Sequence, residues 1–370
     1  MSYHRIVAKF GTSLLTSGTE HLDLSVMTKL VGQVAQLHRQ GKEIIIVSSG
    51  AIAAGKQRFR GISEHKGTPF KQVLASVGQG QLMHTYEQLF SQYDITIAQA
   101  LLTKGDLSDR GGYLNARNTL LALAELNAIC IVNENDVVAL DEIEELKFGD
   151  NDNLSAMVAN LVDADFLVLL TDIGGLYTAD PHRNPKAQLI HRVDKIDAKI
   201  ERLAGSSANR QGIGGMVTKL KAAKLATSSG VDVIMADGRE PDVLVRISHG
   251  ENIGTLFPAQ VNKMESRKRW MLSGLASKGK LVVDKGAVLA LKEQNKSLLP
   301  AGVVEVQGKF QRGDIVEIIN KEGEHIGCGI SNYSSADMAF IKGAHSDKIL
   351  GFLDHKYGDE AIHRNNMVIL

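Results

Sequence analysis

Short apolar segments rich in β-branched residues alternate with longer amphipathic segments over about the first two thirds of the 370-residue chain. Short apolar runs bounded by turn residues predict strands, and apolar residues recurring every three to four positions predict helices. We therefore expect strands at Arg5–Ala8, Glu43–Val47, Ile95–Leu101, Ile129–Val132, Asp165–Leu170 and Val231–Ala236, and helices at Leu24–Gln40, Pro69–Tyr93, Tyr113–Leu126, Asn153–Val162 and Met216–Ser229.

This alternation predicts an α/β fold in which a doubly wound, mainly parallel sheet is covered by helices on both faces. The expected strands are apolar throughout, as is typical of strands buried on both faces of a sheet. The longest apolar runs are far shorter than the roughly 18 residues that a membrane-spanning helix needs. We therefore expect no membrane partner.

The pattern changes after Pro258, where a charged stretch, MESRKRW, precedes short strand-like segments separated by glycines. The segments KLVVDKG, GVVEVQG, DIVEIIN and EHIGCGIS each end at turn residues, which favours a small C-terminal β-barrel. The predicted organisation is a first domain over residues 1–258, a linker over 259–276 and a second domain over 277–370.

Charge and cysteine content narrow the range of partners. The chain has 42 Lys and Arg residues against 42 Asp and Glu residues, and residues 275–370 are balanced in the same way. A protein that binds phosphate backbones normally has a basic excess, so a nucleic-acid partner is not expected. Cys130 and Cys328 lie far apart in apolar or glycine-flanked surroundings, which favours reduced thiols and a cytoplasmic location.

Polar residues follow several of the predicted strands. They occur at Lys9–Ser13, Ser48–Ala51, Asn133–Asp136 and Thr171–Gly175, and a loop is expected to bring a further polar run, Gly149–Asn153, to the start of a helix. Any one cluster could be a helix cap or a turn. In an open parallel sheet, however, ligands bind beyond the carboxyl ends of the strands, so the joint placement predicts one crevice that binds a ligand.

The segment GIGGMVTK, residues 212–219, adds a glycine-rich turn and a lysine at the start of a predicted helix. Its order differs from that of the P-loop, but glycines and a helix N-terminus still favour an anion. Lysines, glycine turns and carboxylates together suit phosphoryl transfer, with Mg²⁺ bridging the phosphates. The 12 histidines show no zinc-ligand spacing, and no Ser-His or Cys-His nucleophile is recognisable.

Six motifs stand out along the first part of the chain: AKFGTSLLT at 8–16, IVSSGAIAAG at 46–55, VNENDVV at 132–138, FGDNDNLSA at 148–156, LLTDIGGLYTADP at 169–181 and GGMVTKL at 214–220. These motifs resemble those of the amino acid kinases, and in particular of the members that act on L-glutamate. The tail resembles a PUA domain, a pseudo-barrel found in RNA-modifying enzymes.

The resemblance implies ATP-dependent phosphorylation of the side-chain carboxylate of L-glutamate to L-glutamyl 5-phosphate. This reaction is the first step of proline biosynthesis, so proline is the expected inhibitor, and a homo-oligomer is expected. A glutamate side chain, with a pKa of about 4.3, is ionised at neutral pH and needs no general base.

The resemblance also implies roles for individual residues. Lys9 and Lys219 would flank the transferred phosphoryl group while Asp152 holds both lysines, and backbone groups at Gly11 and Gly50 would cradle that group. The glutamate-binding residues would be Ser49, Asp136 and Asn151. The nucleotide-binding residues would be Lys9, Thr171, Asp172, Ile213, Gly214, Gly215, Met216, Val217, Thr218 and Lys219.

Two positions depart from the family pattern. Ile213 stands where a threonine is usual, and Val217 replaces a residue that is often small. We expect these changes to alter nucleotide affinity more than chemistry.

Two other functions remain open from the sequence. One is a kinase for a related acid such as N-acetylglutamate or aspartate, against which NEND and GDNDN argue. The other is RNA binding through the tail, against which the balanced charge of the tail argues.

Overall fold

The computed structural model describes residues 3–59, 68–139, 151–181, 183–205, 215–261 and 277–369. The chain divides into two compact units, one containing a seven-stranded sheet and the other a five-stranded sheet. Within the described ranges, no helix has the length and apolar character that crossing a bilayer requires. The predicted domain limits at 258 and 277 stay a prediction.

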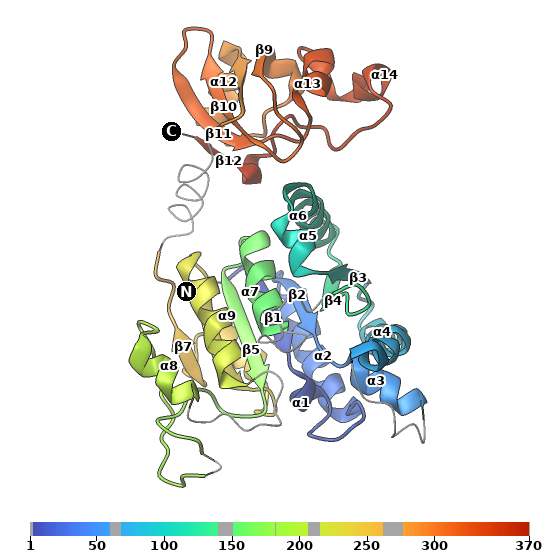
Figure 1. The fold of residues 1–370 in the computed structure, drawn as a ribbon, viewed down its shortest axis with the longest axis vertical. Helices are drawn as coiled ribbons and strands as arrows, with labels where there is room; N and C mark the ends of the chain where they lie inside the picture. The colour runs from blue at the N-terminus through green and yellow to red at the C-terminus, as the bar shows by residue number, and fades with distance from the viewer. Residues whose placement is uncertain are drawn as a thin grey trace. The chain divides into compact units, whose positions relative to one another are not determined.

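The seven-stranded sheet of the first unit is parallel except at one edge, where the last strand runs antiparallel to its neighbour. The strand order is β3-β4-β2-β1-β5-β6-β7, so β2, β3 and β4 lie on one side of β1, with β4 between β2 and the edge strand β3, and β5, β6 and β7 follow in order on the other side (Figure 1). The strands are β1 (Arg5–Phe10), β2 (Glu43–Ser48), β3 (Ile97–Leu102), β4 (Ile129–Glu134), β5 (Phe166–Thr171), β6 (Asp232–Asp237) and β7 (Thr255–Phe257).

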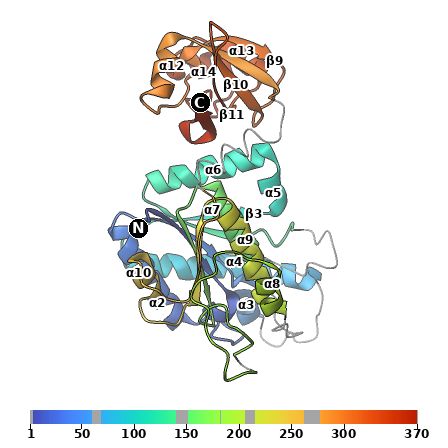
Figure 2. The same cartoon turned by 90° about the vertical axis from the view of Figure 1, so that its left-hand side faces the viewer.

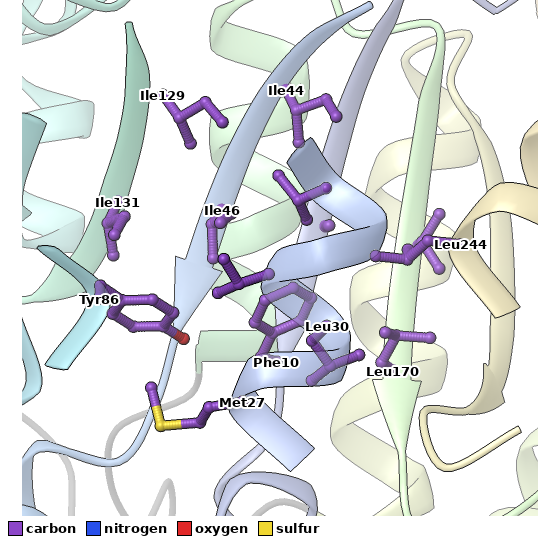
Figure 3. Close-up of a cluster of buried hydrophobic side chains, with 14 of the residues drawn as sticks. Phe10, Met27, Leu30, Ile44, Ile46, Tyr86, Ile129, Ile131, Leu170 and Leu244 are labelled. Atoms are coloured by element: carbon purple, nitrogen blue, oxygen red, sulfur yellow. The ribbon is translucent and has the colours of Figure 1, made fainter. Parts of the chain in front are cut away.

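Helices cover both faces of this sheet. On one face, α2 and α10 pack against a core that includes Phe10, Leu30, Tyr86 and Leu244, shown in Figure 3. On the other face lie α7 and α9, which Figures 1 and 2 show side by side. The helices are α1 (Thr12–Leu15), α2 (Leu24–Arg39), α3 (Ala51–Arg58), α4 (Thr68–Ser91), α5 (Lys104–Ser108), α6 (Arg110–Glu125), α7 (Asn151–Leu161), α8 (Ala198–Gly205), α9 (Met216–Ser228) and α10 (Val243–Ser248).

The predicted α/β fold class is confirmed, and all six strands and five helices predicted in this unit are present within a few residues. The expectation that every strand is apolar and buried on both faces is wrong for β3, which is partly exposed. As the edge strand, β3 has a hydrogen-bonded neighbour on one side only. Helix α7 starts at Asn151, so two polar residues that were expected in a loop lie in its first turn.

The second unit has its own sheet and its own apolar core. Strands β8 and β10 pair in parallel, and the other pairs are antiparallel, in the order β12-β11-β10-β8-β9. All four strands predicted in the tail are present. The elements are β8 (Gly279–Val283), α12 (Lys285–Lys292), η1 (Pro300–Gly302), β9 (Val303–Gly308), β10 (Ile315–Asn320), β11 (His325–Ile330), α13 (Ser335–Ile341), η2 (Ser346–Lys348), α14 (Ile349–Phe352), η3 (Arg364–Asn366) and β12 (Met367–Ile369).

Candidate active site

A buried carboxylate, that of Asp152, lies between two lysines from different elements. Nζ of Lys9 is 2.5 Å from its Oδ1, and Nζ of Lys219 is 3.3 Å from its Oδ2. The hydroxyl of Thr218 also donates to Oδ2, at 2.7 Å. The exposed fractions are 1% for Asp152, 5% for Lys9 and 8% for Lys219, so this charged cluster is almost entirely out of water.

The fold explains why these side chains meet. Alternation along β1 directs Ala8 and Phe10 into the core beneath α2, which leaves Lys9 on the opposite face, where α7 and α9 pack. Asp152 is in the first turn of α7, and Lys219 is one turn inside α9. The cluster therefore joins the central strand to both helices of one face.

The surroundings of this cluster shift the pKa values of Asp152 and Lys219. Burial alone would raise the pKa of Asp152, but the charges of Lys9 and Lys219, with hydrogen bonds from Lys9 and Thr218, outweigh burial and lower the pKa to about 2. Burial lowers the pKa of Lys219, which the Asp152 carboxylate partly restores and the charge of Lys9 lowers further. With both lysines charged, the cluster keeps one net positive charge, which suits an anionic ligand.

A second cluster consists of neutral side chains at the ends of β2 and β4. Nδ2 of Asn151 is 2.9 Å from Oγ of Ser49 and 2.9 Å from Oδ1 of Asn133. Nδ2 of Asn133 in turn donates to Oε1 of Gln79 on α4, at 2.8 Å. Asn151 and Asp152 are consecutive, so the start of α7 links the neutral cluster to the charged one.

Two members of the neutral cluster, Asn133 and Gln79, are absent from the predicted site residues. Asn133 belongs to the polar run after the fourth predicted strand, and that position was the available signal. Gln79 carries no such signal, because it is one of several glutamines in a long helix. Its place in the site depends on how α4 packs.

Asp136 lies in the turn after β4 and is half-buried. Burial raises the pKa of its carboxyl group. Among the described residues it has no hydrogen-bond or ion-pair partner, so the structure does not join it to Ser49 and Asn151 directly.

The residues predicted for the nucleotide follow β5 and precede α9. Thr171 is buried at the end of β5, and its hydroxyl donates to Oδ1 of the exposed Asp172 at 3.0 Å. The charge of Asp172 acts on the pKa of Lys219, which places the two residues near each other. Gly215 is the N-cap of α9, Met216 and Val217 form its first turn, and Ile213 and Gly214 lie outside the described residues.

Two glycines occupy the turns after β1 and β2. Gly50 precedes α3 with φ of +108°, a backbone conformation that other residues rarely adopt. A Cβ atom at Gly11 would lie 3.4 Å from Nζ of Lys9, in van der Waals contact with the lysine. The backbone of the second turn therefore requires Gly50, and Gly11 lies directly beside Lys9.

The described residues contain no group of three or more His, Cys, Asp or Glu side chains that could hold a metal ion. The most buried carboxylate, Asp152, already binds two ammonium groups. The Asp152 carboxylate is therefore not available as a metal ligand in this arrangement, and a Mg²⁺ ion accompanying ATP would be held mainly by phosphate oxygens and water.

Comparison with known proteins agrees with this geometry. The sequence model of the amino acid kinase family matches residues 4–237, and that of the PUA domain matches residues 279–353. The chain therefore belongs to the amino acid kinase family and carries a C-terminal PUA domain, so both predicted resemblances are confirmed.

Within that family, the chain is similar to curated glutamate 5-kinases over its whole length. It is 58% identical to that of Dehalococcoides mccartyi (strain ATCC BAA-2266 / KCTC 15142 / 195), with 100% of this chain and 99% of the relative covered. It is 49% identical to that of Herpetosiphon aurantiacus, covering 98% of each chain, and 48% identical to that of Shewanella oneidensis, covering 100% and 99%.

Proposed function

We propose that this protein transfers the γ-phosphoryl group of ATP to the side-chain carboxylate of L-glutamate, giving L-glutamyl 5-phosphate, as the first step toward proline. The observation that carries the proposal is the buried Asp152 carboxylate between Lys9 and Lys219. The name glutamate 5-kinase borne by the full-length relatives supports the choice of substrate.

The chemistry requires charge neutralisation and positioning, because a glutamate carboxylate is already an ionised nucleophile at neutral pH. Two anions must approach each other, and the ammonium groups of Lys9 and Lys219 reduce their repulsion and stabilise charge on the phosphoryl oxygens. Asp152 does not act as a general base, because a carboxylate whose pKa is lowered to about 2 has little affinity for a proton at pH 7. It fixes the two lysines in position.

The two ligands occupy different sides of the charged cluster in this proposal. Mg²⁺–ATP lies toward the start of α9 and the end of β5, where the N-terminus of α9 at Gly215 favours phosphate anions and Thr171 ends the strand. Glutamate lies toward β2 and β4, where Ser49, Asn151 and Asp136 bind its amino-acid group. The carboxylate of Asp136 suits the α-ammonium group of the substrate.

Three further properties belong to the same proposal. Proline inhibits by overlapping the glutamate pocket, since both molecules carry an α-carboxylate and an ammonium group. The protein is cytoplasmic, and it assembles into a homo-oligomer. The balanced charge of residues 275–370 supports a PUA domain that does not bind nucleic acid strongly.

ATP consumption measured with glutamate, aspartate and N-acetylglutamate side by side tests the proposed function. We expect turnover with glutamate at least 100-fold above that with the other two acids, since a site that hydrogen-bonds a free amino-acid group rejects analogues that leave those bonds unmade. Equal or greater turnover with N-acetylglutamate or aspartate would contradict the proposal.

The role of the lysines is tested by Lys219→Ala, which should lower kcat on the order of 10²-fold because one preorganised charge is lost. Lys224→Ala is the matched control, since Lys224 is on the same helix but its side chain is 61% exposed. Near-normal turnover in Lys219→Ala would remove Lys219 from the mechanism.

A further inference from the structure

The neutral cluster contains two buried polar atoms that have no hydrogen-bond partner among the residues that the structure describes. They are Nε2 of Gln79 and Oδ1 of Asn151. Gln79 is 9% exposed and Asn151 is 7% exposed, so water has little access to either side chain. A buried polar atom without a partner costs free energy, so its presence points to a partner that binds there.

The orientation of each amide follows from the backbone groups that it contacts. Oδ1 of Asn133 accepts from the backbone N–H of Glu134, so Nδ2 of Asn133 must face Gln79. Gln79 therefore presents its oxygen to Asn133, which leaves Nε2, a donor, unpaired. Nδ2 of Asn151 donates to the carbonyl of Ser48, which leaves Oδ1, an acceptor, unpaired.

Packing between two helices holds Gln79 in this place. A Cβ atom at Gly78 would lie 1.8 Å from the carbonyl oxygen of Ala51, and one at Gly55 would lie 2.0 Å from the carbonyl oxygen of Leu74. The backbones of α3 and α4 are thus in direct contact. Because α3 begins just after Ser49, this contact brings Gln79 to the same end of the sheet as the predicted glutamate-binding residues.

A free donor and a free acceptor in one cluster match the two groups of an amino acid. A carboxylate accepts from an amide N–H, and an ammonium group donates to an amide oxygen. We propose that Nε2 of Gln79 donates to the α-carboxylate of the bound substrate while Oδ1 of Asn151 accepts from its α-ammonium group. Gln79 is then a specificity residue for a free α-carboxylate, an inference that rests on the proposed glutamate kinase activity.

Gln79→Glu tests this role with little change in shape. The new side chain keeps an oxygen for Asn133 but replaces the donor by a second oxygen, which repels a carboxylate and accepts from an amide. The two substrates to compare are L-glutamate and its α-amide, L-isoglutamine, which keeps the reacting side-chain carboxylate. We expect the KM for glutamate to rise at least tenfold while the KM for ATP stays within about twofold.

The preference between the two substrates is the decisive measurement. The kcat/KM ratio of glutamate to isoglutamine should fall at least 100-fold in Gln79→Glu, because the variant gains a hydrogen bond to the amide as it loses the carboxylate. Gln79→Leu, which offers neither group, should move the ratio in the same direction by a smaller factor. Gln88→Glu makes the same chemical change at an exposed position of α4 and should leave the ratio unchanged.

An unchanged ratio in folded, active Gln79→Glu and Gln79→Leu would overturn the inference and assign Gln79 a packing role only. An equal rise in the KM values of both substrates would overturn it too, since loss of packing does not distinguish a carboxylate from an amide. Failure of the wild-type protein to phosphorylate glutamate is a separate result, which would overturn the proposed function itself.

Discussion

Replacing Asp152 by Asn removes one charge from the buried cluster with almost no change in shape. The two ammonium groups then lie near each other without the carboxylate that separates their charges. At the wild-type separations of 2.5 and 3.3 Å, an effective dielectric constant of about 20 gives attractions of roughly 7 and 5 kcal/mol. Much of that attraction offsets the cost of removing the ions from water, so we expect a net loss of about 3–5 kcal/mol in unfolding free energy.

The pH dependence of this loss follows from the shifted pKa values. The folded-state pKa of Asp152 is lowered to about 2 from 3.8, so the carboxylate contributes about 2 kcal/mol of stability above pH 4. That contribution disappears as the pH falls toward 2. The difference between wild type and Asp152→Asn should therefore shrink in acid.

Alkaline pH should also narrow the difference. Lys219 has a lowered pKa in the folded protein, and the Asp152 charge opposes that lowering. In the variant this opposition is lost, so the folded-state pKa of Lys219 falls further below its unfolded value than it does in the wild type. Stability then rises with pH between those two pKa values, because the unfolded state binds more protons.

Urea unfolding near pH 3, 7 and 9.5, together with glutamate-dependent ATP turnover, measures both effects. We expect turnover at pH 7 to fall on the order of 10²-fold or more, because the lysines are no longer held in position. Glu201→Gln is the matched control, since it also replaces a carboxylate that pairs with a lysine by an amide. The pair lies at the surface: the side chain of Lys224 is 61% exposed and that of Glu201 is 51% exposed. If Asp152→Asn were as stable and as active as this control at pH 7, the electrostatic account of the cluster would be wrong.

Four further predictions concern the substrate pocket and the domains. Asp136→Ala should raise the KM for glutamate at least tenfold with little change for ATP, and a rise for ATP instead would mean that the two sides of the site are reversed. Gly78→Ala should lower the unfolding free energy by about 2 kcal/mol or more, as in other overpacked cores, because its Cβ would lie 1.8 Å from the carbonyl oxygen of Ala51. In the same unfolding experiment, Gly80→Ala should be neutral or stabilising by up to about 1 kcal/mol, because no atom lies within 4 Å of the added Cβ. Raised glutamate should relieve inhibition by proline in steady-state assays, and inhibition that is indifferent to glutamate would point to a separate site. A chain ending at Gln260 should fold and keep turnover within roughly tenfold, whereas a soluble, folded but inactive fragment would assign the C-terminal domain a part in the active site.

Most of the fold was predictable because hydrophobic periodicity reports burial directly. The β1 segment and the helix now labelled α2 show their burial pattern in the sequence alone. Lys9 and Asp152 were also recognisable as candidate site residues, Lys9 because the ends of parallel strands meet at one edge of a sheet and Asp152 because its polar run resembles a motif of the family. Their contacts with each other and with Lys219 required the packing of α7 and α9 on one face, which no local pattern specifies.

Gln79 could not be predicted because its role depends on two helices whose backbones touch. Glycine in a helix is more often a source of flexibility than a packing contact, and the sequence does not say which neighbour Gly78 and Gly55 face. The contact between these glycines and the opposite helix decides where Gln79 lies. The periodicity of the sequence does not report tertiary contacts of this kind, so the part of the site that depends on them could not be predicted.

The division of the site into a charged half and a neutral half has an electrostatic reason. A transferred phosphoryl group brings several negative charges, so a cluster with one net positive charge attracts it, and Asp152 prevents two buried lysines from repelling each other. An amino acid brings one positive and one negative group at its α-carbon. Amides such as Gln79 and Asn151 offer a donor to one group and an acceptor to the other at no net charge, and the carboxylate of Asp136 is proposed for the ammonium group. Amides beside the substrate and lysines beside the phosphates therefore let one crevice bind both ligands without either set of groups weakening the other.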